Sequence, residues 1–314
     1  MTVAPGPPPE ARPEPRPRRV RIGGVEFDAV TEDRAVAYVM ERARRGEGGH
    51  ILTPNVDILR AITRDRPPHD GAEARPGGRP GDGAGARPGG TPLRELAGRA
   101  ELVVADGMPL VWASRLLGDP LPERVTGASL IWSLSAAAAE HGLPVYLLGG
   151  APGVPERAAR NLAARCPGLV VAGADAPPYG FDADPVEREA VCARVVAARP
   201  GIVFAGLGFP RQDLLIDGLR ERLPGTWFAG CGAAIAFAAG ERRRAPRWMR
   251  DAGLEWAGRL LAEPRRLAGR YLVRDLPFAV SLLARAALAR LTSREPYGGA
   301  PAARRTAESP GTRP

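Results

Sequence analysis

The chain has 314 residues, of which 44% are apolar, so it can bury a sizeable core in one or two domains. Its three cysteines form no Cys-x-x-Cys pair, which argues against a disulfide framework or a cysteine zinc site. No apolar run reaches the roughly 18–20 residues of a spanning helix, and the N-terminus has no apolar stretch of a signal peptide. We therefore expect a cytoplasmic protein.

The positive charge is concentrated near the C-terminus. All 44 positions counted as Lys or Arg are arginine. Residues 241–290 hold 12 arginines and 5 acidic residues, whereas residues 23–240 hold 23 arginines and 26 acidic residues. A nearly neutral body thus carries a basic segment, which would attract an anionic surface such as lipid headgroups, phosphate esters or nucleic acid.

In chain order, residues 1–19 are typical of a disordered arm and residues 20–30 of a small hairpin. Short apolar runs then predict six strands, at Ile51–Thr53, Glu101–Ala105, Val145–Leu148, Leu169–Ala172, Ile202–Ala205 and Thr226–Ala229. Amphipathic stretches predict helices near 31–45, 108–117, 128–141, 153–165, 184–199 and 210–222. This alternation predicts an α/β fold, a Rossmann-like parallel sheet with helices on both faces.

The remaining segments differ in composition. Residues 66–91 are rich in Arg, Pro, Gly and Ala and are predicted to be a low-complexity insertion in a core of residues 20–240. Residues 241–291 predict a basic, amphipathic helical appendage, and residues 292–314 a disordered tail. The mixture of arginine with Trp and Leu in the appendage suits a membrane interface, although a helix packed on the sheet would show a similar stripe.

Ligands of an open parallel sheet bind beyond the carboxyl ends of its strands, so the residues after each strand are candidates. Thr53 and Asn55 follow the first strand and can bind a sugar or cap a helix. Asp106 follows the second and can be a general base or an N-cap. Arg124 lies in the next loop, where it can hold a phosphate or pair with Asp119 or Glu123.

Two glycine-rich turns favour a nucleotide. The turn at Gly149-Gly150 follows the third strand and the turn from Gly206 to Arg211 follows the fifth, where backbone N–H groups can approach a phosphate. Neither has the full dinucleotide fingerprint, which argues against an oxidoreductase. We expect the nucleotide at these turns and at the one after the last strand, involving Gly149, Gly150, Gly208, Pro210, Arg211 and Gly232.

Metal chemistry is not expected. The three histidines are scattered, and Asp182-Ala183-Asp184 precedes a predicted helix, so a turn with an N-cap is the favoured interpretation over a metal-binding D-x-D motif. Acid–base work is then expected from a carboxylate, without a cofactor, and phosphate charge is expected to be met by arginine and backbone amides.

Taken together, the motifs resemble the WecG/TagA/CpsF family of glycosyltransferases (family 26) over about residues 22–275. The matching stretches are Thr53-Pro54-Asn55, Val103–Pro109, Pro122–Gly127, Leu147–Gly150, Pro177–Gly180, Gly206–Asp213, Arg244–Trp248, Gly253–Trp256 and Glu263–Leu267.

This resemblance implies an inverting, metal-independent transfer from a UDP-sugar, with N-acetylmannosamine as the first choice, to a polyprenyl-diphosphate-linked saccharide. It makes Asp106 the base and places Thr53, Asn55, Arg124, Gln212, Arg259 and Arg266 near the substrates. It also implies docking of the appendage on the inner face of the plasma membrane. Nucleic acid is not expected as a partner, and association of identical chains stays open.

Three features depart from the family pattern. Ala236 stands where relatives have Asp, which removes a nucleotide contact, and Gly269-Arg270 stands where relatives often have paired arginines. The third is the 66–91 insertion. The missing Asp bears on the assignment of uridine as the nucleotide base. Within the family, glucose, glucuronic acid or another hexose stays open as the donor sugar. A nucleic-acid-binding protein with a basic tail and a dinucleotide-dependent oxidoreductase are the alternatives outside the family.

Overall fold

The structure is a computed structural model that describes residues 16–65, 92–242, 244–246, 248–249, 253–262 and 264–292. Within the helices, the side chains of Arg259, Ala262 and Arg266 are not described. The expected arm, apart from residues 16–19, and the 66–91 insertion lie outside the described residues. So does the expected tail after Thr292.

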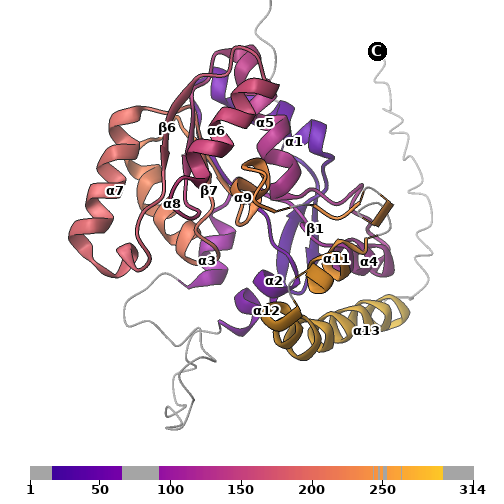
Figure 1. The fold of residues 1–314 in the computed structure, drawn as a ribbon. Helices are drawn as coiled ribbons and strands as arrows, with labels where there is room; N and C mark the ends of the chain where they lie inside the picture. The colour runs from indigo at the N-terminus through magenta and orange to yellow at the C-terminus, as the bar shows by residue number, and fades with distance from the viewer. Residues whose placement is uncertain are drawn as a thin grey trace, which may run out of the picture.

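Six parallel strands form the central sheet in the order β4-β3-β8-β7-β5-β6, with helices on both faces (Figure 1), which confirms the predicted fold class. The strands are β3 (Gly49–Leu52), β4 (Leu102–Val103), β5 (Val145–Leu148), β6 (Val171–Asp175), β7 (Ile202–Ala205) and β8 (Trp227–Gly230). Strand β6 begins two residues later than predicted, because the N–H of Leu169 is used in a turn with the carbonyl of Cys166. Strand β4 is shorter than predicted.

Alternate residues of the strands point to opposite faces, and each face has its own helices. On one face, α1 (Glu32–Arg44), α5 (Gly127–His141), α6 (Val154–Arg165) and α9 (Ala234–Ala238) pack against residues such as Ile51 and Phe204. On the other face, α7 (Pro185–Ala198) and α8 (Arg211–Arg222) cover residues such as Val203 and Phe228. These strands are buried on both sides, which explains their continuous apolar sequence.

A third core lies beside the edge strand β4. It joins α2 (Val56–Arg64), α3 (Leu93–Gly98) and α4 (Met108–Leu117) with the predicted hairpin, β1 (Arg19–Ile22) and β2 (Val25–Asp28). The buried carboxylate of Asp28 accepts a 2.8 Å hydrogen bond from the N–H of Val103 and pairs with Arg19 at 3.1 Å. A side chain therefore occupies an edge N–H of β4 that would otherwise be open to another strand.

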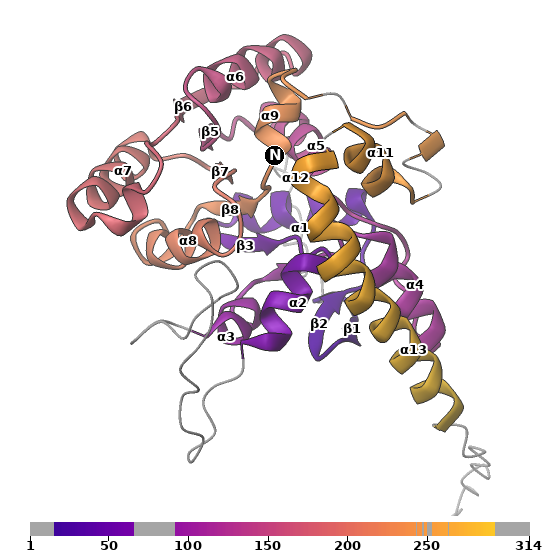
Figure 2. The same cartoon turned by 60° about the horizontal axis from the view of Figure 1, so that its bottom comes forward.

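The C-terminal segment is helical, as expected. Helices α11 (Glu255–Ala262) and α12 (Pro264–Ala268) lead into a π-helix, η2 (Gly269–Asp275), and then α13 (Leu276–Thr292). Helix α13 runs along α4 and past α2, and Figure 2 shows it beside the hairpin. Within the described residues, no helix is long and apolar enough to cross a membrane.

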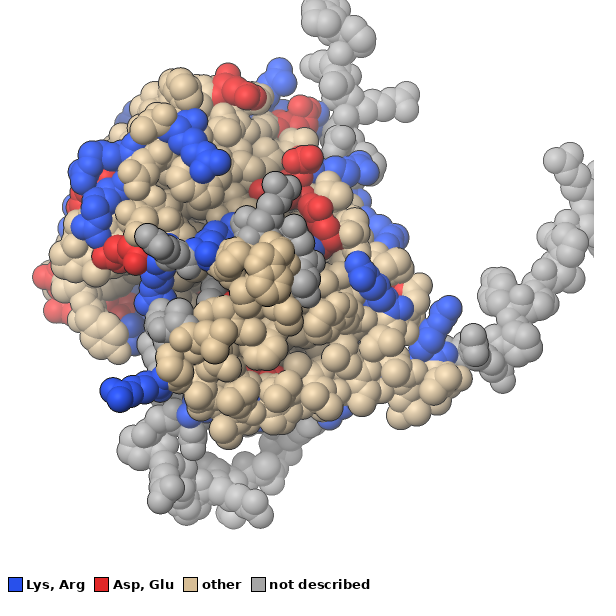
Figure 3. Space-filling model, turned by 45° about the vertical axis from the view of Figure 1, so that its right-hand side comes forward, with Lys and Arg blue, Asp and Glu red and all other residues tan. Residues whose placement is uncertain are grey.

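The outer face of this segment is largely apolar. Figure 3 shows few charged side chains over the region of α13. Several large apolar side chains of the segment are exposed, including Leu261 (80%), Val273 (72%), Val280 (57%), Leu288 (61%) and Leu291 (65%).

Candidate functional site

Thr53, Asp106 and the predicted glycine turns lie along one edge of the sheet, where the carboxyl ends of the parallel strands meet. Strand β5 connects to β6 in one direction and its neighbour β7 connects to β8 in the other. Such a reversal opens a crevice between the two strands at this edge. The glycine turns follow β5, β7 and β8, whereas Thr53 and Asp106 follow β3 and β4.

The glycine turns pack directly against one another. A Cβ on Gly149 would lie 2.8 Å from the carbonyl group of Gly206, and a Cβ on Gly206 would lie 2.8 Å from the carbonyl oxygen of Gly232. Gly149 and Gly150 also have φ angles of 113° and 101°, which strain any other residue. The glycines are thus required for the backbone at this edge, whether or not a phosphate binds to it.

Gln212 joins two of these turns. Its buried side chain accepts hydrogen bonds through Oε1 from the N–H of Gly208 at 3.1 Å and of Gly232 at 3.4 Å. The adjacent Asp213 is fully buried and its Oδ1 lies 3.2 Å from Nε2 of His50 on β3. The sequence did not single out this His50–Asp213 pair, which fastens the start of α8 to the middle of the sheet.

Arg211 does not point to the centre of the edge. Its guanidinium lies 4.9 Å above the ring of Tyr179 and donates a 3.2 Å hydrogen bond to the hydroxyl, and its Nε is 3.5 Å from Asp182.

Asp184 accepts hydrogen bonds from the N–H groups of Val186 and Glu187, which makes it the N-cap of α7. The turn-and-cap interpretation of the D-x-D sequence is therefore confirmed. Pro210 follows Phe209 through a cis peptide bond.

At the other end of the edge, Thr53 and Asn55 hold the backbone. The buried hydroxyl of Thr53 donates a 2.8 Å hydrogen bond to the carbonyl of Gly230, which joins the ends of β3 and β8. Asn55 Oδ1 accepts from the N–H of Ile58 at 3.0 Å, so Asn55 is the N-cap of α2, one of its two predicted roles. Its side chain also lines the pocket described below.

Asp106 is not a helix cap, because Gly107 occupies the N-cap position of α4 without a side-chain hydrogen bond. The N–H of Asp106 donates to the carbonyl of Pro54 at 2.9 Å. Its Oδ2 lies 3.4 Å from the N–H of Gly127, the first residue of α5. The Asp106 side chain therefore lies at the N-terminal end of α5.

Arg124 pairs with the C-terminal segment rather than with a nearby acid. Its Nη1 donates a 3.0 Å hydrogen bond to Oε2 of Glu255 on α11, and Glu255 Oε1 lies 3.5 Å from Nε of Arg244. The proposed surface partners are used elsewhere: Asp119 pairs with Arg18, and Glu123 accepts from the N–H of Glu32. The buried carboxylate of Glu255 thus docks α11 over the Arg124 loop.

A second set of ion pairs joins α2 to the π-helix η2. Arg60 lies 2.6 Å from Asp57 and 3.5 Å from Asp275, and Arg270 lies 3.1 Å from Asp57 and 3.7 Å from Asp275. Burial, together with the charge of Asp57, raises the pKa of Asp275 to about 6, although both arginines oppose the shift. Two carboxylates therefore share two arginines at this junction.

These contacts enclose a pocket of about 230 Å³. Asn55, Asp106 and Arg124 supply polar groups to its wall, and Trp112, Trp256 and Leu276 supply apolar surface. Helices α2, α4, α11 and α13 and the π-helix all contribute residues. An amphiphilic ligand fits this lining, with its polar part at Asp106 and its apolar part along α13. Arg270, Tyr271 and Asp275 also line the pocket, and sequence reasoning did not include them in the site.

Arg259 lies in α11 and Arg266 in α12, but their side chains are outside the described part, so their predicted place at the site stays a prediction. Within the described residues, no group of three or more His, Cys, Asp or Glu side chains is arranged to hold a metal ion.

A family model described as "Glycosyl transferase WecG/TagA/CpsF family" matches residues 89–292. The matched range begins before Asp106 and ends at the last residue of α13, so it includes the pocket residues of α4, α11, the π-helix and α13 but not those of α2. Thr53 and Asn55 precede it.

Proposed function

The chain belongs to the WecG/TagA/CpsF family of glycosyltransferases, and we propose that it transfers a sugar from a UDP-sugar to a polyprenyl-diphosphate-linked saccharide with inversion at the anomeric carbon. The observation that carries this proposal is the position of Asp106, whose carboxylate lies in the wall of a pocket with a polar end and an apolar side. Family membership favours a transferase over the oxidoreductase and the nucleic-acid-binding alternatives.

In this mechanism Asp106 is the general base. It takes the proton from the acceptor hydroxyl as that oxygen attacks the anomeric carbon. The bond between the anomeric carbon and the UDP oxygen breaks on the opposite side, and its electron pair leaves with UDP. General-base assistance of this kind contributes about 10²–10⁴-fold to the rate.

The leaving diphosphate would lie at the glycine turns after β5, β7 and β8, which involve Gly149, Gly150, Gly208, Pro210, Arg211 and Gly232. Backbone N–H groups there can stabilise negative charge that develops on the leaving oxygen. Arg124, Arg259 and Arg266 are the candidates for further positive charge, and no step in this proposal uses a metal ion. Gln212 would act by holding the turns of Gly208 and Gly232 in place.

The acceptor would enter the pocket from the membrane. Its saccharide hydroxyl would approach Asp106, and its polyprenyl chain would lie along the apolar residues of the pocket wall, such as Trp112 and Leu276. The exposed apolar side chains of the C-terminal helices suit contact with the inner face of the plasma membrane. Residues 241–291 are then a docking appendage to a catalytic core of residues 20–240.

The test is a donor screen against a short-chain polyprenyl-diphosphate-GlcNAc acceptor in EDTA, with nucleotide release and product mass as readouts. Turnover with UDP-N-acetylmannosamine in EDTA is the expected result. Turnover with another UDP-hexose would keep the mechanism and correct the donor sugar. A requirement for a GDP-sugar would contradict the assignment of uridine as the nucleotide base, and Ala236, which stands in place of the family Asp, would then be the first residue to consider. Turnover only after a divalent cation is added would contradict metal independence.

A further inference from the structure

A second and larger hollow lies on the other side of α13. Its volume is about 1020 Å³, and it is bounded by the β1–β2 hairpin, α2, α3, α4, the π-helix η2 and α13. Figure 2 shows the hairpin, α2 and α13 around this region. We call it the arginine groove, because six arginines line it and no acidic residue does: Arg21, Arg60, Arg64, Arg94, Arg274 and Arg285.

Much of this charge is not neutralised by nearby acids. Arg21 pairs with Glu26 and Arg60 belongs to the Asp57–Asp275 cluster. Arg94 donates a 2.8 Å hydrogen bond to the carbonyl of Gly24, which is not charged. In the part of the chain that the structure describes, no carboxylate oxygen lies within 4 Å of the guanidinium of Arg64 or Arg285. The groove is therefore suited to an anion.

Apart from Thr63 and Ser281, the other residues of the groove carry no polar side chain. Leu117, Val273, Phe278 and Leu282 line it together with the arginines, and Val273 is 72% exposed at its border. A free phosphate would use only the arginines and leave this apolar surface in water. An amphiphile that carries a phosphate uses both, because its chains can cover the apolar residues while its headgroup contacts guanidinium groups.

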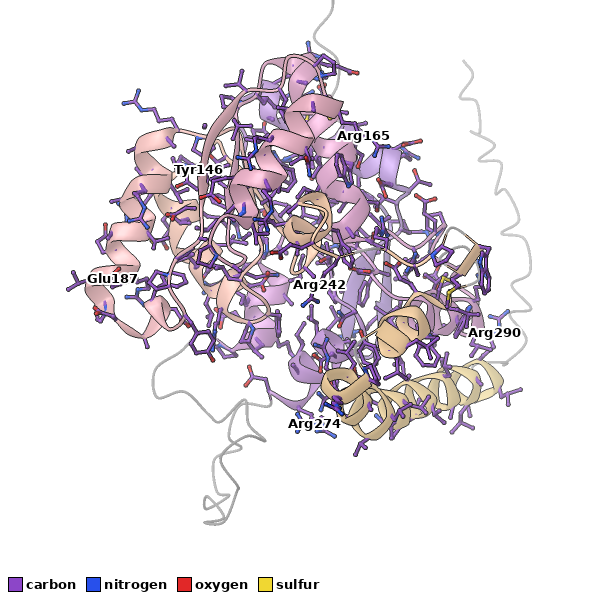
Figure 4. The ribbon with its side chains drawn as sticks, in the orientation of Figure 1. Tyr146, Arg165, Glu187, Arg242, Arg274 and Arg290 are labelled. Atoms are coloured by element: carbon purple, nitrogen blue, oxygen red, sulfur yellow. The ribbon has the colours of Figure 1, made fainter. Side chains whose placement is uncertain are left out.

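The groove is separate from the pocket that contains Asp106. Leu276, Val280 and Leu283 of α13 line the Asp106 pocket, whereas Phe278, Leu282 and Arg285 of the same helix line the groove. Four of the six arginines come from residues 21–94, outside the basic C-terminal segment that the sequence emphasised. Figure 4 labels Arg274, one of the two from the C-terminal segment, beside the start of α13.

We propose that the arginine groove binds the headgroup phosphate of an anionic phospholipid, with the acyl chains along α13. The exposed apolar side chains of Leu272 and Leu288 lie on the same C-terminal helices, so a lipid in the groove would continue the apolar surface that they form. The site would fix how the protein lies on the membrane. It requires neither the donor sugar nor the acceptor of the proposed function.

The test uses monomeric dihexanoylphosphatidylglycerol in solution, titrated into the whole protein by calorimetry. The double variant Arg64→Gln/Arg285→Gln removes the two arginines without acidic partners. It leaves Arg60 unchanged, because Arg60 pairs with Asp57 and Asp275 of the Asp106 pocket. Its matched control, Arg160→Gln/Arg188→Gln, removes two exposed arginines of α6 and α7. We expect roughly 10- to 30-fold weaker binding for the groove variant. We expect less than a twofold change for the control, because distant exposed charges are screened beyond about 10 Å.

Three results with the lipids would overturn the proposal: unchanged binding in the groove variant, an equal loss in both double variants, or no preference for dihexanoylphosphatidylglycerol over dihexanoylphosphatidylcholine. A fourth comes from inorganic pyrophosphate, which separates the two sources of phosphate. Pyrophosphate is added as a competitor, so that binding elsewhere on the protein does not count. If it displaces the lipid only weakly, the apolar residues contribute and the lipid assignment stands; if it displaces the lipid at the lipid's own concentration, that assignment is wrong. Because no sugar nucleotide is present, this outcome is independent of the transferase assay.

Discussion

The carboxylate of Glu255 lies 3.0 Å from the guanidinium of Arg124, although the two residues are 131 positions apart. Both side chains are largely buried, at 7% and 16% exposure. This ion pair fastens α11 to the loop before α5 and so encloses the pocket around Asp106. It links the C-terminal helices to the residues that would perform the transfer.

We predict that Glu255→Gln loosens α11 without unfolding the sheet. The change leaves Arg124 and Arg244 near a neutral group, and removal of one partner of a buried pair costs about 3–5 kcal/mol. Hydrogen exchange should show faster exchange of the amides in residues 253–262 and unchanged exchange in β5 and β7. The control is Glu189→Gln, which breaks an exposed pair with Arg222. Equal protection of α11 in both variants would contradict the docking role of Glu255.

Asp106→Asn should lower the transfer rate by about 10²–10⁴-fold with little change in the melting temperature. The amide keeps the size of the side chain but cannot accept the proton from the acceptor hydroxyl. Asp184→Asn is the matched control, because Asn is an equally good N-cap for α7. Turnover of the Asp106 variant close to that of the control would rule out Asp106 as the base.

The sequence was sufficient for the sheet and for the place of Asp106 at its carboxyl edge, because both depend on local patterns. Apolar runs with alternating helices predict a parallel sheet, and the position of Asp106 after a strand places it at the carboxyl edge. Whether Asp106 caps α4 could not be predicted, since that depends on whether the N-cap falls at residue 106 or 107. The structure places it at Gly107.

The partners of the charged residues could not be predicted. Asp119 and Glu123 are near Arg124 in sequence, but Arg124 pairs with Glu255. The Asp57–Asp275 cluster and the arginine groove likewise combine residues from both ends of the chain, so no local spacing indicates them. The π-helix has no sequence signal of its own, and it follows a helix whose first residue is Pro264.

Gly206→Ala should destabilise the protein and weaken binding of the donor nucleotide. The added Cβ would lie 2.8 Å from the carbonyl oxygen of Gly232 and 2.9 Å from Ile235, so the turns after β7 and β8 must move apart. We expect a loss of about 1–3 kcal/mol in the free energy of unfolding, measured by chemical denaturation, as for other overpacked sites.

Gly218→Ala is the control: residue 218 lies inside α8 with open space around its Cβ, so this change should stabilise the protein by about 0.5–1 kcal/mol. Equal nucleotide affinity in the two variants would argue against a donor site at these turns.

Replacing exposed leucines of the C-terminal helices should weaken membrane binding. Leu261 and Leu288 are 80% and 61% exposed, and their burial in lipid would contribute to docking. The double variant Leu261→Gln/Leu288→Gln should bind vesicles of phosphatidylglycerol roughly 10-fold more weakly in a co-sedimentation assay. Val170→Gln/Val186→Gln changes two exposed residues (52% and 76%) of the distant β6 and α7 region and should bind as the unmodified protein does. A similar loss in both variants would show that no particular face docks.

Asp275 should make stability depend on pH between about 4 and 6. Its pKa is raised from 3.8 to about 6 in the folded protein, so the folded state holds a proton that the unfolded state has lost. Stability from this group is therefore present at low pH and falls as pH rises through about 6. Between pH 5 and pH 7.5 the loss should be about 1–2 kcal/mol. The charged groups that face Asp275 are Asp57, Arg60 and Arg270.

The measurement is the free energy of unfolding at pH 5 and pH 7.5 for the unmodified chain and for Asp275→Asn. Histidines and other acids titrate in both proteins, so the difference between the two pH dependences isolates residue 275. Asp275→Asn should lose about 1–2 kcal/mol less than the unmodified chain over this range. If the two dependences are equal, the ionisation of Asp275 does not affect the junction between α2 and the π-helix. If the unmodified chain instead gains stability relative to the variant as pH rises, the pairs with Arg60 and Arg270 outweigh the burial of the carboxylate.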